Sequence, residues 1–491
     1  MQSVRLTPWR HRTLAVALGV AAALGQAPWG LWPLTLVALA GLIWLLDRDA
    51  HWRGAFWTGL LAGSGYFGLA LSWIVEPFLI DIARYGWMAP FAVVFLSVGL
   101  GLFWAGAAAL ARVFRDPVLG FVVAFAGLEW LRGVILTGFP WALVGHVWIG
   151  TPVDQLAAVI GPSGLSLLTL VLAALPVLWR WRGALVSAVV LAGAFGFGLW
   201  RLAQPLPEPG ALTVRLVQPN AEQSLKWEAD RAREFLDRLL TLTAEGEAPD
   251  LTIWPETAVP YMLEYAPDVA GMVVQASGGA PVALGIQREE GERFYNSLRV
   301  LEGSGVETAR YDKAHLVPFG EYIPFGDIAY DWFGLRAFAA QAGNSYSAGP
   351  GPQVLDLGPL GKVLPLICYE AIFSREVNAM PERADWMLQI TNDAWFGVQT
   401  GPYQHFAQAR LRAVEQGLPL IRVANTGITA VVDARGRVLD SLPFGTMASL
   451  DTQIPGALPP TAYSRFGDLP LLLLLAGLAA LAMQRRRVAA H

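Results

Sequence analysis

The chain of 491 residues contains one cysteine, Cys368, directly after an apolar run at 362–367 that is typical of a buried strand. A lone thiol at the end of a strand, with an acidic residue two positions on, is a common arrangement for a nucleophile. The alternative is a buried structural cysteine, because free cysteines pack well in cores. This segment alone leaves both interpretations open, and other residues decide between them.

Two further ionisable residues follow strand-like segments. Glu256 comes after 251–254, and Lys313 lies at the start of the segment 311–322. These residues and Cys368 are too far apart in the chain to form a local motif. In open α/β sheets, sites form at the carboxyl ends of strands. We therefore expect a sheet to gather the three side chains.

Their acid–base properties suggest a covalent mechanism. A free thiol is mostly protonated at neutral pH, so Glu256 would take its proton as general base. The ammonium of Lys313 would stabilise the thiolate and the oxyanion, and the backbone N–H of Tyr369 would be a second oxyanion donor. The product is a thioester, which indicates acyl transfer or amide hydrolysis without a metal or cofactor. Taken singly, a lysine or glutamate is more often a solvated surface residue. We expect structural or surface roles for His315 and His405, because no third ligand accompanies them.

Composition indicates a membrane protein. The chain is 54% hydrophobic and 15% charged, whereas soluble domains carry about 25% charged residues. The net charge of −4 and the lack of a basic block argue against nucleic acid as a partner. A single cysteine excludes an internal disulfide.

Eight apolar segments are candidates for membrane-spanning helices. They cover 13–26, 31–46, 55–75, 88–111, 117–136, 163–179, 185–202 and 469–484. The first follows several arginines, as in a signal peptide, but we favour a retained helix. Arginines concentrate in alternate connecting segments, while the other short loops contain little beyond Arg84. The positive-inside rule then predicts eight crossings, both termini in the cytoplasm, and residues 206–465 in the periplasm.

Composition changes at the proline-rich linker 204–210, after which strand-like and helix-like segments alternate. This pattern predicts a layered α/β domain. Strands are expected at 212–218, 251–254, 282–286, 295–301, 362–367, 386–390, 420–424, 430–433 and 438–439, and helices at 221–246 and 403–416. The predicted domains are therefore a seven-helix membrane domain at 1–205, a catalytic domain at 206–465, and a final helix with a cytoplasmic tail at 466–491.

Glu256, Lys313 and Cys368, in this order, resemble the Glu-Lys-Cys triad of the nitrilase (carbon–nitrogen hydrolase) superfamily. Longer motifs resemble its membrane branch, the apolipoprotein N-acyltransferase family, over essentially the whole chain. These motifs are Trp-Pro-Glu-Thr at 254–257, Asp-Lys at 312–313 with Val-Pro-Phe-Gly-Glu-Tyr at 317–322, Cys-Tyr-Glu at 368–370, Thr-Asn-Asp-Ala-Trp-Phe-Gly at 391–397 and Arg-Val-Ala-Asn-Thr-Gly at 422–427.

The resemblance implies a fold, an activity and partners. The fold is an αββα sandwich on eight transmembrane helices in the bacterial inner membrane, as a monomer. The activity moves an acyl chain from a phospholipid to the cysteine, and then to the amine of a diacylglyceryl-cysteine at the N-terminus of an apolipoprotein. By motif match, the supporting residues are Glu321, Tyr369 and Glu370. The implied substrate-binding residues are Phe139, Trp141, Trp227, Asn392 and Trp395.

Other readings stay open beside this one. A membrane-tethered nitrilase-type amidase is the first alternative, and a transporter with an outer binding domain is a weaker one. Glu129 and Arg132, three apart in the fifth apolar segment, are interpreted as an ion pair that positions the loop 137–141; direct contact with a phospholipid headgroup is the alternative. The glycine-flanked segment 335–349 is a candidate lid, or a well-ordered surface loop.

Overall fold

The computed structural model describes residues 7–484, apart from 224, 226–228, 260 and 324–344. Trp227 and most of the candidate lid at 335–349 lie outside the described residues. The chain forms two compact units. Unit 1 comprises Met1–Gln204, Gln399–Ala407 and Thr461–His491, and unit 2 comprises Pro205–Val398 and Gln408–Pro460.

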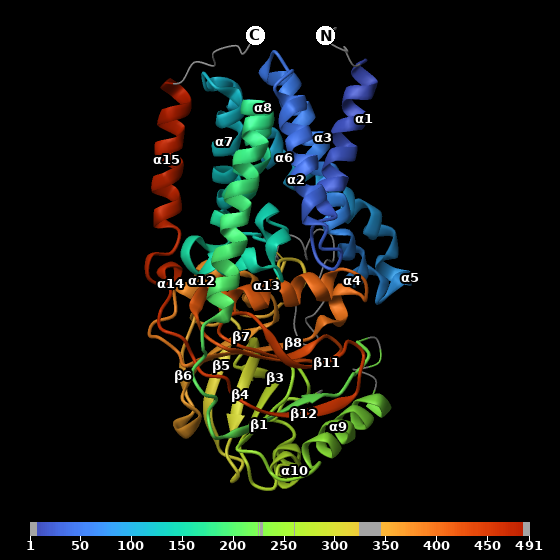
Figure 1. Cartoon of the computed structure of the whole chain (residues 1–491). Helices are drawn as coiled ribbons and strands as arrows, with labels where there is room; N and C mark the ends of the chain where they lie inside the picture. Colours follow the sequence, from blue (N-terminus) through green and yellow to red (C-terminus); the bar gives the residue numbers. More distant parts are fainter. Residues whose placement is uncertain (1–6, 224, 226–228, 260, 324–344, 485–491) are drawn as a thin grey trace. The chain divides into compact units, whose positions relative to one another are not determined.

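Unit 1 is helical, and each of the eight predicted apolar segments is helical over most of its length (Figure 1). The long helices are α1 (Pro8–Ala23), α2 (Trp32–Leu46), α3 (Trp52–Ala70), α6 (Ala89–Leu110), α7 (Pro117–Arg132), α8 (Ala157–Ala203) and α15 (Leu469–Gln484). Short helices α4 (Glu76–Leu79) and α5 (Ile82–Tyr85) lie between α3 and α6, and α14 (Ala462–Phe466) precedes α15. Glycines allow close packing, as at Gly63, where an added Cβ would lie 2.8 Å from the Cα of Gly101.

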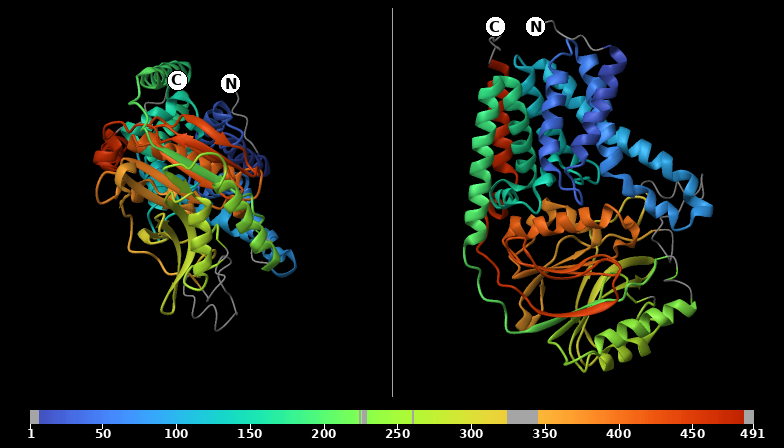
Figure 2. Two further views of the ribbon diagram at one scale, coloured as in Figure 1. Left: turned by 90° about the horizontal axis from the view of Figure 1, so that it is seen from below. Right: turned by 45° about the vertical axis from the view of Figure 1, so that its right-hand side comes forward.

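Helix α8 is broken at Gly161 and again at Arg180, which has a left-handed φ of 55° and joins its two long helical segments. The hydroxyl of Ser187 donates to the carbonyl of Leu172 at 2.9 Å, so the two segments lie side by side (Figure 2). This agrees with the sequence prediction of two apolar segments separated by arginines.

Length and apolarity identify fewer membrane spans than the sequence predicted. Among the described residues, Ile82–Val113 and Pro152–Ala203 are long and apolar enough to cross a membrane. A third candidate is the pair Trp52–Ala70 and Ser72–Leu79, which is bent by 66°. α2 and α15 are apolar but shorter. Eight crossings therefore stay a prediction.

Unit 2 contains two six-stranded mixed sheets, whereas the alternating sequence pattern predicted a layered α/β domain with nine strands. The first has the order β12-β1-β2-β3-β4-β5, and the second has the order β11-β10-β9-β8-β7-β6. The strands are β1 (Thr213–Gln218), β2 (Leu251–Ile253), β3 (Val282–Glu290), β4 (Arg293–Leu301), β5 (Glu307–Asp312), β6 (Leu355–Asp356), β7 (Lys362–Ile367), β8 (Trp386–Thr391), β9 (Leu420–Ala424), β10 (Thr429–Val432), β11 (Val438–Leu442) and β12 (Ala448–Gln453).

Parallel pairs lie at the centre of both sheets. In the first sheet β1, β2 and β3 are parallel neighbours, and in the second β7, β8 and β9 are. These central strands are buried on nearly every residue, which suits parallel strands covered on both faces. Glu256 follows the carboxyl end of β2 and Cys368 follows that of β7, so both residues lie at the strand ends where the sequence predicted them.

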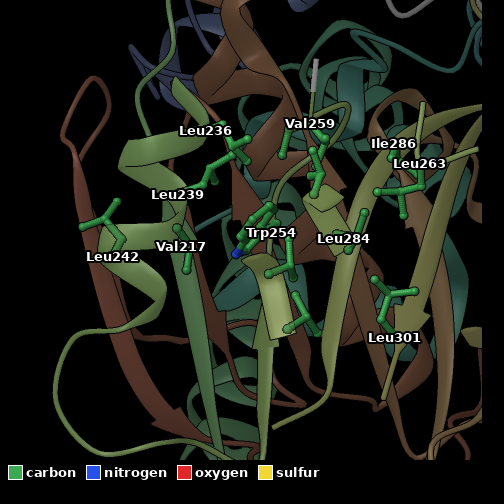
Figure 3. Packing of buried hydrophobic residues seen from close by; sticks show 14 residues of the cluster. Val217, Leu236, Leu239, Leu242, Trp254, Val259, Leu263, Leu284, Ile286 and Leu301 are labelled. Atoms are coloured by element: carbon green, nitrogen blue, oxygen red, sulfur yellow. The ribbon is translucent and has the colours of Figure 1, made fainter. Parts of the chain in front are cut away.

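Helices α9 (Ala229–Thr243) and α10 (Pro267–Ala276) cover the first sheet (Figure 1). Leu236 and Leu239 of α9 pack into a core around Trp254 (Figure 3). Each buried leucine of this kind contributes roughly 2 kcal/mol relative to exposure. The indole N–H of Trp254 donates to the Thr243 hydroxyl at 2.8 Å, so its polar atom is also satisfied. This packing fixes the strand end that precedes Glu256.

Two shorter helices follow strands of the second sheet. α12 (Ser374–Asn378) comes after the turn η7 (Cys368–Ile372), and α13 (Gly401–Gln416) comes after the turn η8 (Asp393–Phe396). The predicted helix at 403–416 is therefore confirmed, whereas the helix predicted at 221–246 begins only at Ala229 and ends at Thr243.

Candidate active site

The three residues predicted to act together converge in unit 2. Glu256 follows β2, Lys313 follows β5 and Cys368 follows β7, and all three are buried, at 6%, 1% and 5% exposure. The Nζ of Lys313 lies 3.7 Å from Oε1 of Glu256. The backbone N–H of Asn392, directly after β8, donates to Oε2 of Glu256 at 2.8 Å, and β8 pairs with β7 up to the residue before Cys368, so the strand ends bring the thiol to this carboxylate.

Cys368 has a strained backbone. Its φ is 53°, in the left-handed region, where a residue with a Cβ is disfavoured by roughly 1–2 kcal/mol. It stands between the end of β7 and the first residues of η7. Strain of this kind persists only where the surrounding structure enforces it, and it clusters at active sites. The sharp turn distinguishes Cys368 from a cysteine that merely fills a core.

The carboxylate of Glu256 is oriented on both oxygens. Oε1 accepts a hydrogen bond from the amide of Asn296 at 2.7 Å, and Oε2 accepts one from the backbone N–H of Asn392 at 2.8 Å. Gly285 lets β3 approach this turn, because a Cβ there would lie 2.3 Å from the carbonyl oxygen of Pro255 and 2.7 Å from the Cα of Glu256. The carboxylate is thus held in one orientation beside Lys313.

Glu321 completes the charge cluster around Lys313. Its carboxylate accepts from Lys313 at 2.9 Å, from Asn296 at 3.1 Å and from the backbone N–H of Val317 at 2.8 Å. Burial alone would lower the pKa of Lys313, but the carboxylates of Glu321 and Glu256 outweigh it and raise that pKa above its ordinary value. Lys313 is therefore a permanent ammonium at neutral pH.

The thiol of Cys368 is protonated at rest. Burial raises its pKa well above the usual value, and the charge of Glu256 raises it further, while Lys313 and a hydrogen bond from Thr391 lower it. A neutral thiol with a carboxylate beside it needs a base at the moment of attack. Glu256 and Lys313 are the groups that could take the proton and stabilise the resulting charge.

Glu370 connects the Lys313 loop to the turn of the cysteine. Its Oε1 accepts from the Tyr311 hydroxyl at 2.7 Å and from the backbone N–H groups of Ala314 and His315 at 2.7 and 3.1 Å. Its Oε2 accepts from the backbone N–H of Ile367 at 2.7 Å. Burial raises the pKa of Glu370, while these hydrogen bonds lower it. One side chain therefore sets the spacing between two of the three candidate catalytic residues.

Tyr369 lies in an aromatic cluster beside this junction. Its ring packs edge-on against Phe373 and His315, which themselves stack at 3.8 Å. His315 Nδ1 is 2.6 Å from a carboxylate oxygen of Glu376. His315 thus has the structural surroundings that the sequence predicted for it.

The predicted substrate-binding residues are distributed over both units. In unit 2, Asn392 is buried and its amide donates to Gln223 at 2.6 Å, while Trp395 is half-buried in η8. In unit 1, Phe139 is half-buried and stacks on Trp141 with ring centroids 6.4 Å apart. Trp141 is fully buried, and its indole N–H donates to Gln404 at 2.7 Å. Their roles toward a substrate stay predictions.

Glu129 and Arg132 hold the loop after α7, as the sequence predicted. Arg132 donates to the carbonyl oxygens of Phe139 and Trp141 at 2.7 and 2.8 Å, and Glu129 accepts from the backbone N–H of Val144 at 2.9 Å. The two charged groups are 4.0 Å apart and buried. Backbone groups of this segment bind Nη1 of Arg132 and Oε1 of Glu129, which supports the positioning role over contact with a headgroup. His405 stacks on Trp141 in the same unit.

Several residues at the site were not found from the sequence. Asn296 binds both Glu256 and Glu321, and Tyr346 is buried with its backbone N–H on the carbonyl of Glu321 at 2.8 Å. Neither lies in a motif that signals chemistry, because an asparagine within a strand and a tyrosine after a loop are common. Their role depends on position in the fold: Asn296 lies opposite Gln287 in the β3–β4 pair, and β3 separates it from β2, the strand that precedes Glu256.

Comparison with known protein families covers both units. Residues 18–175 match the model of the apolipoprotein N-acyltransferase N-terminal domain, and residues 213–458 match that of carbon–nitrogen hydrolases. An apolipoprotein N-acyltransferase from Caulobacter vibrioides is 42% identical over 96% of this chain and 94% of its own length. The chain belongs to the apolipoprotein N-acyltransferase family. The family resemblance predicted from the motifs is confirmed.

Other relatives in this family align along most of their length. An apolipoprotein N-acyltransferase from Sinorhizobium medicae is 40% identical over 90% of this chain and 89% of its own. The one from Brucella melitensis is 39% identical over 93% and 92%. A solved amidase of the nitrilase superfamily, from Nesterenkonia AN1, is 17% identical over 55% of this chain and 99% of its own, with a TM-score of 0.39. That likeness is too weak to support an inference.

Proposed function

We propose that this chain transfers an acyl chain from a membrane phospholipid to the N-terminal amine of diacylglyceryl-cysteine in apolipoproteins, through a thioester on Cys368. Membership of the acyltransferase family supports the reaction. The observation that carries the mechanism is the buried cluster of Cys368, Glu256 and Lys313, in which a neutral thiol, an oriented carboxylate and an ammonium meet.

In the first half-reaction, Glu256 takes the proton of the thiol as Sγ attacks the ester carbonyl of the phospholipid. The ammonium of Lys313 and the backbone N–H of Tyr369 stabilise the oxyanion. Collapse breaks the ester C–O bond, and Glu256 returns its proton to the leaving oxygen. The products are the thioester and a lysophospholipid.

In the second half-reaction, the amine of the acceptor attacks the thioester carbonyl. Glu256 takes a proton from the attacking nitrogen, and the C–S bond breaks as the amide forms. The thiolate of Cys368 leaves under the stabilising charge of Lys313 and recovers its proton from Glu256. An ester donor and an amide product make the overall transfer favourable without a further energy source.

The location follows from the lipid nature of both substrates. We place the chain in the bacterial inner membrane with eight crossings, both termini cytoplasmic and the catalytic domain in the periplasm, as a monomer. The alternating arginines support this orientation. Phe139, Trp141, Asn392 and Trp395 are the proposed contacts with lipid substrates, along with Trp227, which lies outside the described residues.

The direct test is the intact mass of the purified full-length protein after incubation with phospholipid and no acceptor. We expect one added acyl chain, removed by hydroxylamine and absent in Cys368→Ala. Because Cys368 is the only cysteine, a hydroxylamine-labile adduct has one possible site. A fully folded preparation that releases lysophospholipid without ever carrying the adduct would rule out the covalent mechanism.

A second measurement separates the acyltransferase from the tethered amidase. Adding a diacylglyceryl-cysteine peptide to the acylated protein should discharge the thioester and give a triacylated peptide. An amidase would instead hydrolyse small amides and leave the phospholipid intact. Hydrolysis of small amides without lysophospholipid release would favour that alternative.

A further inference from the structure

In addition to Glu256 and Lys313, four buried polar side chains lie near Cys368 and hydrogen-bond to one another. The set consists of Gln389 and Thr391 on β8, Asp393 in η8 and Arg422 on β9. All four have 0% exposure. The general base and the oxyanion donors of the proposed mechanism do not use them.

Strand register brings these side chains together. Gln389 and Thr391 are two residues apart on β8, so they share one face of the sheet. Arg422 on β9 is the direct partner of Gln389, and β7, which ends at Cys368, pairs with the other edge of β8. The pairing of three adjacent parallel strands, β7, β8 and β9, therefore places these four side chains beside the turn that contains Cys368.

One branch of the set holds the backbone of Cys368. The amide of Gln389 donates to the carbonyl oxygen of Cys368 at 3.0 Å. The other end of that amide accepts from Nε of Arg422 at 2.9 Å. Because an amide has distinct donor and acceptor ends, the arginine fixes which end faces Cys368. This bond anchors the carbonyl of the residue with the left-handed φ.

The other branch reaches the thiol. Arg422 pairs with Oδ2 of Asp393 at 2.7 Å, and Oδ1 of Asp393 accepts from the Thr391 hydroxyl at 3.1 Å. Thr391 in turn hydrogen-bonds to the side chain of Cys368. Gly427 leaves room for the carboxylate, since a Cβ there would lie 2.1 Å from Oδ2 of Asp393. Both branches therefore start from one ion pair.

We propose that Arg422 and Asp393 are positioning residues for Cys368, acting on its carbonyl through Gln389 and on its thiol through Thr391. This rests on the proposed function only in taking Cys368 as the nucleophile. The hydroxyl of Thr391 has a single proton. It donates that proton to Asp393 while the sulfur is a thiol, and turns it toward the sulfur when the thiolate forms. Asp393 thus holds the hydroxyl beside the sulfur while the thiol is protonated, so that its proton is in place when the thiolate forms.

The test uses alkylation of the thiol by iodoacetamide, followed by intact mass on the full-length protein across a pH series. Only Cys368 can react as a thiol, and no phospholipid is needed. Thr391→Val should shift the profile to higher pH and lower the rate at pH 8 by about tenfold, the size expected of a hydrogen bond to a charged group. Thr391→Ser should restore the wild-type profile. A Thr391→Val protein that alkylates as the wild type does would overturn the thiol branch.

A matched pair of arginine variants tests the ion pair. Arg422→Lys keeps the charge but cannot reach both Gln389 and Asp393. Arg215→Lys is the control, because Arg215 is also buried, at 2% exposure, and pairs through two nitrogens with Asp451 in the first sheet. We expect Arg422→Lys to show slower alkylation and a lower kcat at unchanged KM. Arg215→Lys should show neither change. Equal losses in both variants would assign a merely structural role.

Gly427→Ala provides a variant that removes no polar group, in case Arg422→Lys does not fold. Its methyl group should displace Asp393 and shift the profile in the opposite direction from Thr391→Val, because the charge of Asp393 raises the pKa of the Cys368 thiol. A folded Gly427→Ala protein with the wild-type profile contradicts the role of Asp393. If the wild type carries no acyl chain but these profiles still shift, the proposed function fails while the positioning role stands.

Discussion

The Nζ of Lys313 lies 2.9 Å from both carboxylate oxygens of Glu321. Glu256 is the more distant carboxylate, with Oε1 at 3.7 Å. Glu321 is therefore the ion-pair partner that keeps the ammonium in place, and it leaves Glu256 to exchange protons with the thiol. The two buried carboxylates therefore have different roles: Glu321 holds the ammonium, and Glu256 transfers protons.

Glu321→Gln should slow formation of the acyl-enzyme by about tenfold to a hundredfold, because Lys313 would then pair more closely with Glu256. Glu256→Gln should slow it more, by roughly 10²–10⁴, the range for a general base. Single-turnover acylation measured by intact mass distinguishes the two. Equal rates for Glu321→Gln and wild type would contradict the pairing.

Removing the ammonium should change the acidity of the nucleophile. Burial raises the pKa of Cys368 and the charge of Lys313 lowers it, so Lys313→Met should raise that pKa further. The thiolate fraction at neutral pH should fall by about tenfold or more, as expected for the loss of an opposite charge. Iodoacetamide labelling against pH measures this. Lys362→Met, at a half-exposed ion pair on β7, is the control and should label as the wild type does.

Asp312, directly before Lys313, should stabilise the fold in a pH-dependent way. Burial would raise its pKa, but hydrogen bonds from Arg288 and Ser297 outweigh it, and the pKa is lowered. A lowered pKa contributes stability above the unfolded value of about 3.9, and this is lost as pH falls through the folded pKa. Asp312→Asn should therefore cost about 2 kcal/mol at pH 7, and much less near pH 3.

Thermal unfolding of the full-length protein at these two pH values measures the difference. Glu290→Gln is the matched control, because Glu290 pairs with the same Arg288 from an exposed position. Its effect should be small at both pH values. A destabilisation by Asp312→Asn that does not depend on pH would contradict the ionic origin.

Glu370→Gln should destabilise the fold and slow acylation together. A glutamine cannot accept at both ends, so its NH₂ group would face backbone N–H donors at Ile367 or at Ala314 and His315. We expect a loss of about 2–3 kcal/mol and slower acylation of Cys368. Glu376→Gln, at the nearby and more exposed partner of His315, should change stability by less than about 1 kcal/mol. Similar effects for both would show that Glu370 has no special role.

The central strands and the three converging residues were predictable because buried parallel strands are continuous apolar runs, and polar residues at their ends stand out. The two edge strands of the first sheet were not predicted. β5 and β12 lie at the two edges of the first sheet, and their short, mostly polar sequences with charged residues resemble loops. Charged edge strands are common because they discourage pairing with other chains.

Partner residues in the site were harder to predict for another reason. Arg422 and Gln389 are separated by a helix in sequence, and only the register of β8 and β9 makes them neighbours. Arg422 belongs to a motif that resembles the family, but the motif does not show that its partners are Gln389 and Asp393. Pairing between elements, rather than the identity of any one residue, is the information that a single sequence does not contain.

The left-handed backbone at Cys368 affects how this sequence can evolve. At a φ of 53° every side chain carries a conformational cost that glycine escapes. Selection for folding alone would therefore replace the residue on which the chemistry depends. Glu256 and Lys313 differ, because each has other buried hydrogen-bonding groups that would be left unpaired by its loss, Asn296 for Glu256 and Glu321 for Lys313. A lineage that no longer needed acyl transfer should lose the cysteine first and keep its charged neighbours as a relic of the former site.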